Sequence, residues 1–233
     1  MAVSGQGEDL AGRAEKGPRA RMKRTMLDAA MRLMQGGLIP SVSDVAESAG
    51  VSRATAYRYF PSQAAMIEAT VGEALGPILA WRSSSVDPEE RVEELLEFAF
   101  PRIEDYEATH RAVLLQALDQ WTRQKAGVLG SEPRFVRGNR KRLLGEAAAP
   151  LARAMGKPAF DRLVQSLSLI FGTEALVVLK DIWGLSGEEA RRVAIWAALA
   201  LVRTAEAEAV SAKAGPAART KASAAKKPRL RRN

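Results

Sequence analysis

The sequence predicts an all-α protein, with a three-helix N-terminal domain that contains a helix-turn-helix and a larger helical domain after it. The first observation is the segment 42–67, VSDVAESAGVSRATAYRYFPSQAAMI, which has the pattern of two short helices joined by a tight turn. The second is the helical spacing of apolar residues further along the chain. The third is that no useful length of sequence alternates between apolar and polar residues, as a half-buried strand would.

The first two helices are predicted from residues that start or stop a helix. A helix over residues 19–35 is expected to end at Gly36-Gly37. Ser41 can cap the next helix, with Asp44 three residues later as its partner in a capping box.

The turn and the third helix follow from the next residues. Gly50 suits the left-handed backbone after the second helix, and Ser52 can cap a third helix over residues 53–60. Pro61 breaks that helix and can open a fourth one, which runs toward Trp81.

The rest of the chain is expected to be helical as well. Asp87 is a cap before a proline and two glutamates, which suit the positive end of a helix dipole. Pro101 is expected to kink or end that helix. Ser186 and Glu189 form a second capping box. The later helices are expected at 107–123, 135–155, 159–182 and 187–210.

The composition excludes several kinds of site. The 233-residue chain has no cysteine, so it has no disulfide and no thiolate metal site, and its single histidine, His110, rules out multi-histidine sites. The sequence contains no glycine-rich phosphate loop and no Ser-His-Asp set around His110. We therefore expect no enzymatic activity, no cofactor and no metal.

The distribution of apolar residues predicts a protein without a membrane partner. The N-terminal residues lack the apolar run of a signal peptide. The longest apolar run, 193–202, is ten residues, whereas a membrane-spanning helix needs roughly 20. We therefore expect a cytoplasmic protein.

The charge is unevenly distributed and suggests four segments. The net charge is +8, and residues 211–233 hold eight basic residues and no acid. Residues 19–66 hold seven basic and three acidic residues. We predict a disordered N-terminal segment over 1–18, a DNA-binding domain over 19–66, a helical domain over 67–210 and a disordered basic tail over 211–233.

The predicted third helix carries side chains that suit DNA recognition. Arg53 lies in its first turn, and a bidentate Arg–guanine contact discriminates between bases by about 1–3 kcal/mol. Ala54 leaves room for a thymine methyl group, and Thr55, Tyr57 and Tyr59 suit phosphate contacts. The residues expected to contact DNA are Ser41, Ser43, Ser52, Arg53, Ala54, Thr55, Tyr57, Arg58, Tyr59, Gln63 and Arg21.

Four cations lie at the start of the first predicted helix, at positions 19, 21, 23 and 24. Cations at a helix N-terminus oppose the helix dipole, so a phosphate or a minor groove could favour them. A solvated charged face is the alternative.

The order DVAESAGVSRATAYRYFPSQAAMI, residues 44–67, resembles the N-terminal domain of the TetR family of bacterial transcriptional regulators. The match rests on fixed spacing of Val45-Ala46, Ala49-Gly50-Val51-Ser52, Thr55, Tyr57 and Tyr59-Phe60. The resemblance implies an all-α homodimer whose N-terminal helices bind DNA and whose C-terminal domain serves ligand binding and dimerisation. It also implies a repressor that a small molecule releases from its operator, and a bacterial protein associated with the nucleoid when bound to DNA.

Two positions depart from the family pattern. After the aromatic pair and the proline, family members usually have Ser or Asn followed by Lys, whereas this chain has Ser62-Gln63. Gln63 can donate a neutral hydrogen bond, but one charge contact per half-site is lost. Ala56 stands where a larger aliphatic residue is common.

Residues 193–202 are apolar all round, so a helix there needs cover on two sides. We expect its own domain on one side and a second subunit on the other, in a four-helix bundle with the similar helix before it. A wholly intrachain core is the alternative. A homodimer would read a palindromic operator with half-sites about 34–36 Å apart. The expected interface residues are Ile170, Leu176, Val177, Ile195, Trp196, Leu199 and Val202.

Aromatic and apolar side chains on the middle helices suggest a pocket for a small apolar or aromatic ligand. Plain core packing is the alternative for each of them. The residues expected to line this pocket are Trp81, Phe98, Tyr106, His110, Leu114, Trp121 and Phe171.

Two hypotheses of function follow. The first is a sequence-specific DNA-binding transcriptional regulator, a homodimeric repressor released by a small-molecule ligand. The alternative is an architectural, largely non-specific DNA-binding protein driven by the basic tail.

Overall fold

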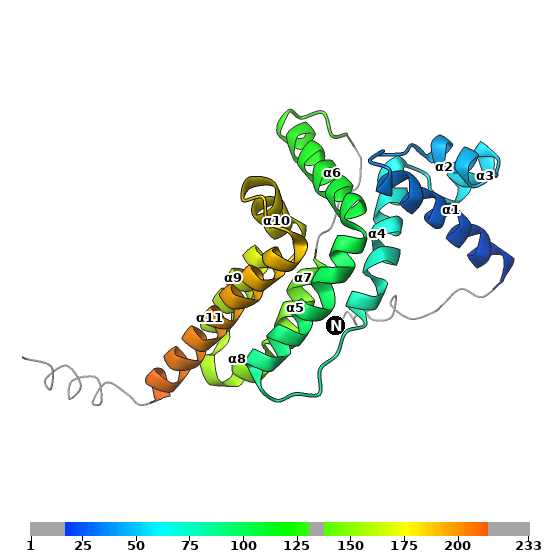
Figure 1. Ribbon diagram of the computed structural model, residues 1–233. Coiled ribbons are helices and arrows are strands. Elements are labelled where there is room, and N and C mark those ends of the chain that lie inside the picture. Colours follow the sequence, from blue (N-terminus) through cyan, green and yellow to red (C-terminus); the bar gives the residue numbers. More distant parts are fainter. Residues whose placement is uncertain (1–16, 131–137, 214–233) are drawn as a thin grey trace, which may run out of the picture. The chain divides into compact units, whose positions relative to one another are not determined.

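The structure is a computed structural model, and it describes residues 17–130 and 138–213. Every regular element in these ranges is a helix, so the predicted all-α fold is confirmed (Figure 1). The predictions for residues 1–16 and 214–233 lie outside the described residues. The elements are α1 Pro18–Gln35, α2 Val42–Ser48, α3 Arg53–Tyr59, α4 Gln63–Leu79, α5 Pro88–Asp105, α6 Glu107–Lys125, α7 Asn139–Ala147, α8 Ala149–Met155, α9 Lys157–Ile170, α10 Thr173–Leu176, the π-helix η1 Val177–Ile182 and α11 Gly187–Lys213.

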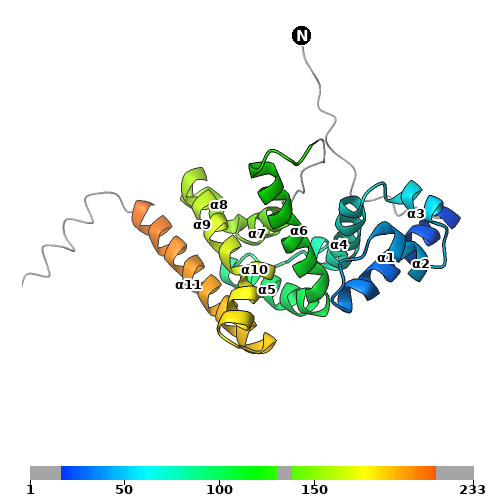
Figure 2. The same cartoon turned by 90° about the horizontal axis from the view of Figure 1, so that it is seen from above.

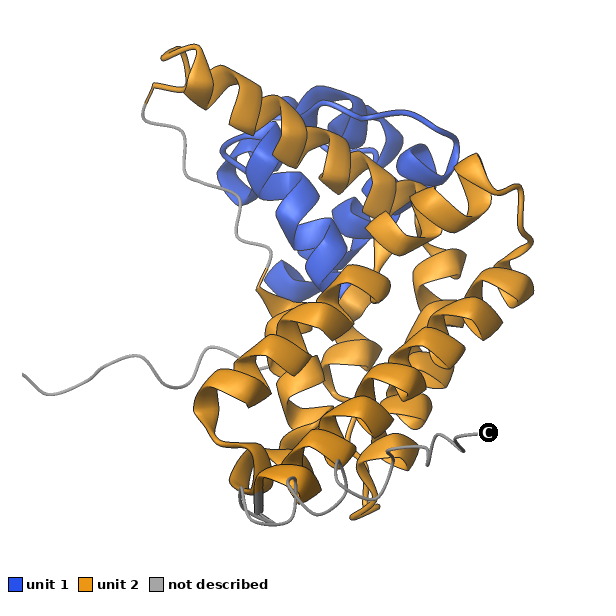
Figure 3. Ribbon diagram, turned by 90° about the vertical axis from the view of Figure 1, so that its left-hand side faces the viewer, with its two compact units in different colours: residues 1–73 blue, residues 74–233 orange. Residues whose placement is uncertain are grey.

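The chain divides into two compact units, residues 1–73 and residues 74–233, and the division falls inside α4 (Figure 3). Each unit has its own hydrophobic core. The domain limits expected from the sequence, 19–66 and 67–210, stay a prediction.

The first unit is a small bundle in which α2 packs against both α1 and α3 (Figure 2). Apolar side chains on one side of each helix meet in its core, as the helical spacing requires. The buried members of this core are Met26, Leu27, Ala29, Ala30, Val42, Val45, Ala46, Ala56, Phe60 and Met66.

The second unit is built around α5 and α11, which pack along one another, with α7, α8 and α9 against them (Figure 1). The predicted cap of α5 is present, because Asp87 Oδ1 accepts hydrogen bonds from the backbone N–H groups of Glu89 at 2.8 Å and Glu90 at 3.2 Å. The predicted cap of α11 is present too, with the Glu189 N–H donating to Ser186 Oγ at 3.3 Å.

Pro101 does not end its helix, because α5 continues to Asp105. Phe100 and Ile103, on either side of the proline, are buried in the same core. Their packing outweighs the one backbone hydrogen bond that a proline cannot donate.

The sequence predicts one continuous helix over 135–155 and another over 159–182. Each is broken in the structure, so both predictions of a continuous helix were wrong. The first breaks at Ala148, where Pro150 lies in the first turn of α8. The second breaks at Gly172, whose φ of 109° is in the region that favours glycine. Gly172 therefore turns the backbone between α9 and α10.

No single helix within the ranges 17–130 and 138–213 is long and apolar enough to cross a membrane. The pair Lys157–Ile170 and Thr173–Ile182, bent by 49°, passes the test of length and composition only when taken together.

Candidate nucleic-acid interface

The helix-turn-helix is held by local hydrogen bonds that the sequence predicts. Ser41 and Asp44 form the complete capping box: the Asp44 N–H donates to Ser41 Oγ at 3.2 Å, and the Ser41 N–H donates to Asp44 Oδ2 at 2.8 Å. The backbone and side-chain hydrogen bonds from Ser41 lower the pKa of Asp44. The start of α2 is therefore fixed without help from the rest of the chain.

The turn between α2 and α3 is equally well defined. Gly50 has a φ of 67°, and the Val51 N–H donates to the Ala46 carbonyl at 2.9 Å. Ser52 then caps α3, because its Oγ accepts from the Thr55 N–H at 3.1 Å. The two hydroxyl groups of Ser52 and Thr55 are also hydrogen bonded, at 2.9 Å.

One side of α3 is buried, and the other faces solvent. Ala56 is fully buried beneath the helix, and Phe60, the residue that follows α3, is buried too. Both belong to the core of the first unit, where α3 packs on α2. The opposite side of the helix is free for a partner.

The structure brings most of the predicted DNA contacts onto this free side. Thr55 and Tyr59 are half-buried, and Tyr57 is 48% exposed. A short exposed helix with small, basic and aromatic side chains is what entry into a major groove requires. The other members of the predicted set on α3 and its cap are exposed, namely Ser52, Arg53, Ala54 and Arg58.

The predicted contacts outside α3 are more mixed. Arg21 on α1 is exposed, whereas Ser41 and Ser43 at the start of α2 are half-buried. Gln63 is exposed, but its amide nitrogen donates to the Pro40 carbonyl at 3.0 Å. Its donor group is thus already used within the first unit.

The seven residues expected to line a ligand pocket are spread over the second unit. Trp81 and Phe171 are buried in its core, where Phe171 meets Phe100 edge to face with ring centroids 6.3 Å apart. The Arg102 guanidinium covers the Phe98 ring at 3.6 Å. Trp121 is 60% exposed. The remaining two besides His110, namely Tyr106 and Leu114, are half-buried.

His110 is the most unusual member of that set. It is buried, its Nε2 has no hydrogen-bond partner among the described residues, and burial lowers its pKa to about 4. The neighbouring Thr109 Oγ1 is also buried without a partner there. Two buried polar atoms side by side in the chain are available to a polar group that enters this part of α6.

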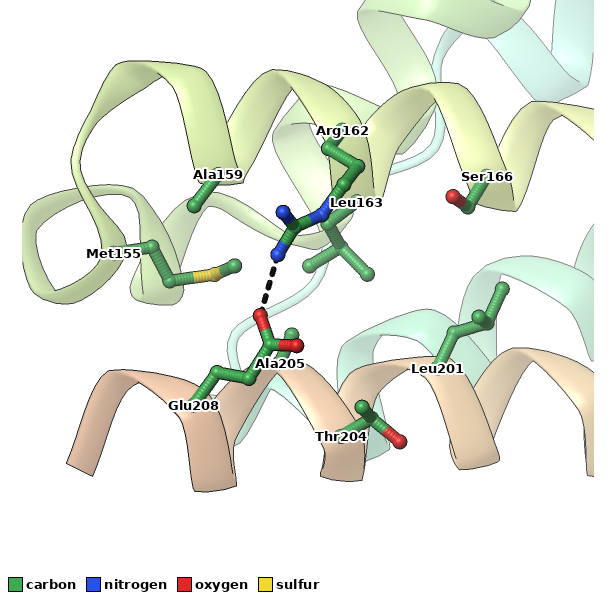
Figure 4. A pocket seen from close by; sticks show the side chains of 9 residues that line it. All are labelled: Met155, Ala159, Arg162, Leu163, Ser166, Leu201, Thr204, Ala205 and Glu208. Atoms are coloured by element: carbon green, nitrogen blue, oxygen red, sulfur yellow. Dashed lines mark hydrogen bonds and ion pairs between the residues drawn. The ribbon is translucent and has the colours of Figure 1, made fainter. Parts of the chain in front are cut away.

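The second unit has cavities elsewhere. One, of about 70 Å³, lies between α9 and α11 and is bordered by the Arg162–Glu208 ion pair (Figure 4). Another, of about 560 Å³, is lined by residues that include Lys141, Arg142 and Phe160. Neither contains any of the seven expected pocket residues.

The residues expected at a dimer interface fall into two groups. Leu176, Ile195 and Val202 are buried inside the second unit, and their apolar character is explained by its core. Trp196 is 73% exposed. The other three, Ile170, Val177 and Leu199, are half-buried.

Other exposed apolar side chains lie near these and were not predicted from the sequence. Leu169 on α9 is 78% exposed, and Ile182 at the end of the π-helix and Trp183 after it are also exposed. The sequence signal for each is that an apolar residue stands next to one already assigned to the core. Helical spacing places two such neighbours on different faces of the helix.

Within the ranges 17–130 and 138–213, no group of three or more His, Asp or Glu side chains could hold a metal ion.

The fold and this interface define a class: proteins with an N-terminal helix-turn-helix domain and a larger helical domain. The family model of bacterial regulatory proteins of the tetR family matches residues 26–70, which include α2 and α3. The N-terminal part of the chain is therefore similar to bacterial regulatory proteins of the tetR family.

Two curated relatives match the N-terminal part. The chain is 34% identical over 84 residues to the HTH-type transcriptional regulator BetI of Rhizobium meliloti (strain 1021), covering 34% of this chain and 41% of that protein. It is 38% identical over 55 residues to the HTH-type transcriptional repressor LfrR of Mycolicibacterium smegmatis, covering 24% of this chain and 29% of that protein. The chain thus matches less than half the length of either relative.

A solved structure matches most of the fold. A TetR transcriptional regulator from Rhodococcus sp. RHA1 superposes with a TM-score of 0.51 at 19% identity, over 80% of this chain and 97% of that one. At this identity the likeness shows the fold alone.

Proposed function

We propose that this protein is a sequence-specific DNA-binding transcriptional regulator, a homodimeric repressor that a small molecule releases from a palindromic operator. The observation that carries the proposal is the free face of α3, where Arg53, Ala54, Tyr57 and Arg58 are all exposed on a helix anchored by buried Ala56. The two relatives, a transcriptional regulator and a transcriptional repressor, support the same class of function.

The exposed apolar side chains of the second unit support a dimer. α9 and α11 lie side by side, and Leu169 and Trp196 are exposed on them (Figures 1 and 2). Large exposed apolar side chains are typical of interaction surfaces. A second subunit that packs α9 and α11 against their copies would bury these side chains in a four-helix interface.

The buried, unpartnered Nε2 of His110 and Oγ1 of Thr109 support a ligand that acts on the second unit. A buried polar atom without a hydrogen bond costs about 1–3 kcal/mol. A small apolar or aromatic molecule with one polar group would recover that cost and bury its apolar part against the core.

A selection of duplexes from a random pool tests the proposal directly. The full-length protein is compared with Arg53→Ala and with a chain that ends at Lys213, the last residue of α11. We expect a palindromic site that is lost with Arg53→Ala and kept without the tail.

The opposite result would favour an architectural role. If no sequence is enriched, and if binding disappears when residues 214–233 are removed, the basic tail rather than α3 would account for DNA binding.

A further inference from the structure

An open cleft in the first unit joins the start of α1 to the end of α3. It has a volume of about 650 Å³, and it is lined by Pro18, Arg19 and Met22 from α1 and by Thr55, Arg58 and Tyr59 from α3. We propose that this cleft is a clamp for one phosphate of the DNA backbone, held by Arg19 and Arg58 on the Tyr59 ring. The proposal rests on the DNA-binding function above and names a contact that fixes α3 in its register.

The geometry of the two arginines is the first argument. The Cζ atoms of Arg19 and Arg58 lie 5.7 Å and 5.9 Å from the centroid of the Tyr59 ring. Both distances are within the range of a cation–π contact, about 6 Å. Guanidinium groups from two different helices therefore lie near the same ring and line the same cleft. Planar guanidinium groups match phosphate oxygens with paired hydrogen bonds.

The lack of compensating acid is the second argument. In the part of the chain that the structure describes, neither Arg19 nor Arg58 is in an ion pair, whereas nearby Arg24 pairs with Glu73 at 3.7 Å. The first turn of α1 contains no acidic residue. Two positive charges that line one cleft repel each other, and an anion bound in the cleft would offset this repulsion.

The position of the cleft indicates which anion it would bind. Arg58 and Thr55 belong to the same short helix as Arg53, whose exposed side chain is expected at the bases. A phosphodiester that flanks the bases read by α3 would therefore lie next to the cleft. Phosphate contacts of this kind position a reading helix on the duplex without carrying sequence information.

The cleft changes the predicted set of contacts. Arg19 was absent from that set, and Arg21, which belonged to it, does not line the cleft. Tyr59 is assigned here as a positioning residue, which acts by holding the arginines.

The test compares the full-length protein with Arg19→Gln and Arg58→Gln, and the control is Arg32→Gln. Arg32 is an exposed arginine in the last turn of the same helix and lies outside the cleft. The affinity is measured against salt concentration on the duplex selected by the protein and on a scrambled duplex. Each arginine lost should make the slope of log K against log salt less negative by about 0.9 for each bound subunit. We also expect roughly tenfold weaker binding at moderate salt.

Two further comparisons separate a phosphate clamp from a folding effect. Tyr59→Phe keeps the ring, so its DNA affinity should depend on salt as that of the wild type does. Tyr59→Leu removes the ring, so it should lose as much DNA affinity as an arginine variant. A scan of neutral methylphosphonate linkages should find one phosphate per half-site whose neutralisation weakens the wild type but not Arg19→Gln. Melting temperatures show which variants are folded.

The outcomes separate the clamp from the function on which it rests. If Arg19→Gln and Arg58→Gln shift the slope no more than Arg32→Gln does, the clamp is overturned while specific DNA recognition stands. The wild type could instead prefer neither duplex while both cleft variants still make the slope less negative. In that case the proposal of sequence-specific regulation fails and the clamp stands. If the wild type and the three arginine variants bind each duplex equally at every salt concentration, the clamp is overturned.

Discussion

The side-chain amide of Gln63 donates a hydrogen bond to the carbonyl of Pro40 at 3.0 Å, which ties the first turn of α4 to the loop before α2. In the family that the sequence resembles, a lysine usually stands at this position and meets the DNA backbone. This chain therefore has an internal hydrogen bond at the position where the family pattern has a lysine.

Two substitutions at Gln63 should act on different properties. Gln63→Ala should lower the free energy of unfolding by about 1 kcal/mol, because the Pro40 carbonyl loses its donor. Gln63→Lys should strengthen DNA binding and make the salt slope steeper by about 0.9 for each bound subunit. Denaturant unfolding and a salt series of DNA titrations measure the two effects. An unchanged slope for the lysine variant would mean that this position lies away from the backbone.

Arg91 is expected to be the most sensitive arginine of the second unit. Its guanidinium donates to four carbonyls, those of Ser83 at 3.3 Å, Ser85 at 2.9 Å, Glu146 at 2.7 Å and Ala147 at 3.0 Å. Arg91→Met should lower the free energy of unfolding by about 2–3 kcal/mol, because the partly buried carbonyls at the end of α7 lose their donor. Urea unfolding measures the change.

The matched control for Arg91 is Arg192→Met, because Arg192 forms only an exposed pair with Glu188 on the same helix. That substitution should change the free energy of unfolding by no more than about 0.5 kcal/mol. Equal losses for both variants would show that the four carbonyl contacts do not matter.

Gly187 and Glu104 should show strong coupling. A Cβ at Gly187 would collide with the Glu104 carboxylate, which also lies 3.4 Å from Lys180 Nζ. Gly187→Ala should therefore displace the flexible Glu104 side chain, and at this first residue of α11 it should give less than the stabilisation of about 0.5–1 kcal/mol that glycine-to-alanine changes give inside helices. In a Glu104→Ala background the same change should regain it, so a double-mutant cycle reports the contact.

Gly145 in α7 is the control for Gly187, because a Cβ there would meet no atom within 4 Å. Gly145→Ala should stabilise the protein in both backgrounds. The collision would be refuted by a Gly187→Ala variant that is equally stabilised with Glu104 present.

His110 should make the protein less stable as the pH falls. Burial holds its folded-state pKa at about 4, below the ordinary value of 6.5, so the unfolded chain takes up a proton first. Stability is therefore lost progressively between about pH 6.5 and pH 4, with a loss of about 2 kcal/mol by pH 5. Unfolding curves at pH 7 and pH 5 measure this difference.

The pH dependence of His110 can be separated from that of the carboxylates. Hydrogen bonds from Arg111 lower the pKa of Asp181, and those from Lys180 and Arg111 outweigh burial and lower that of Glu107. Their stabilising effects are present above the ordinary pKa values of 4.5 and 3.8 and are lost as the pH falls from there toward the lowered values, so most of that loss comes below pH 5. His110→Leu should therefore abolish most of the difference between pH 7 and pH 5. A variant with unchanged pH dependence would assign the effect elsewhere.

The sequence predicts the N-terminal unit well because its signals are local. The capping box of Ser41 and Asp44, the left-handed Gly50 and the cap at Ser52 each involve residues within a few positions of one another. Local hydrogen bonds of this kind fix a helix start whatever the rest of the chain does.

The second unit is less predictable because its breaks depend on packing and on single residues inside apolar runs. Pro101 stays inside a helix because the core on both sides holds it, whereas Pro150 begins a new one. The π-helix Val177–Ile182 has no sequence signal in the helical spacing. The cleft lined by Arg19 and Arg58 was also unpredictable, because the two arginines are far apart in sequence and reach one cleft only through the packing of α1 and α3 on α2.

The exposed tryptophan of α11 gives the sharpest test of the proposed dimer. Trp196 is 73% exposed, and a charge at this position would be buried twice in a symmetric interface. Trp196→Glu should therefore reduce the mass in light scattering from that of a dimer to that of one 25.2 kDa chain. Trp121→Glu, at the 60% exposed tryptophan of α6, is the matched control and should stay dimeric. If both variants keep the mass of the wild type, the face that carries Trp196 does not hold two subunits together. A monomeric Trp196→Glu should also lose affinity for a palindromic duplex while it keeps binding to a single half-site, because the interface rather than α3 has been changed.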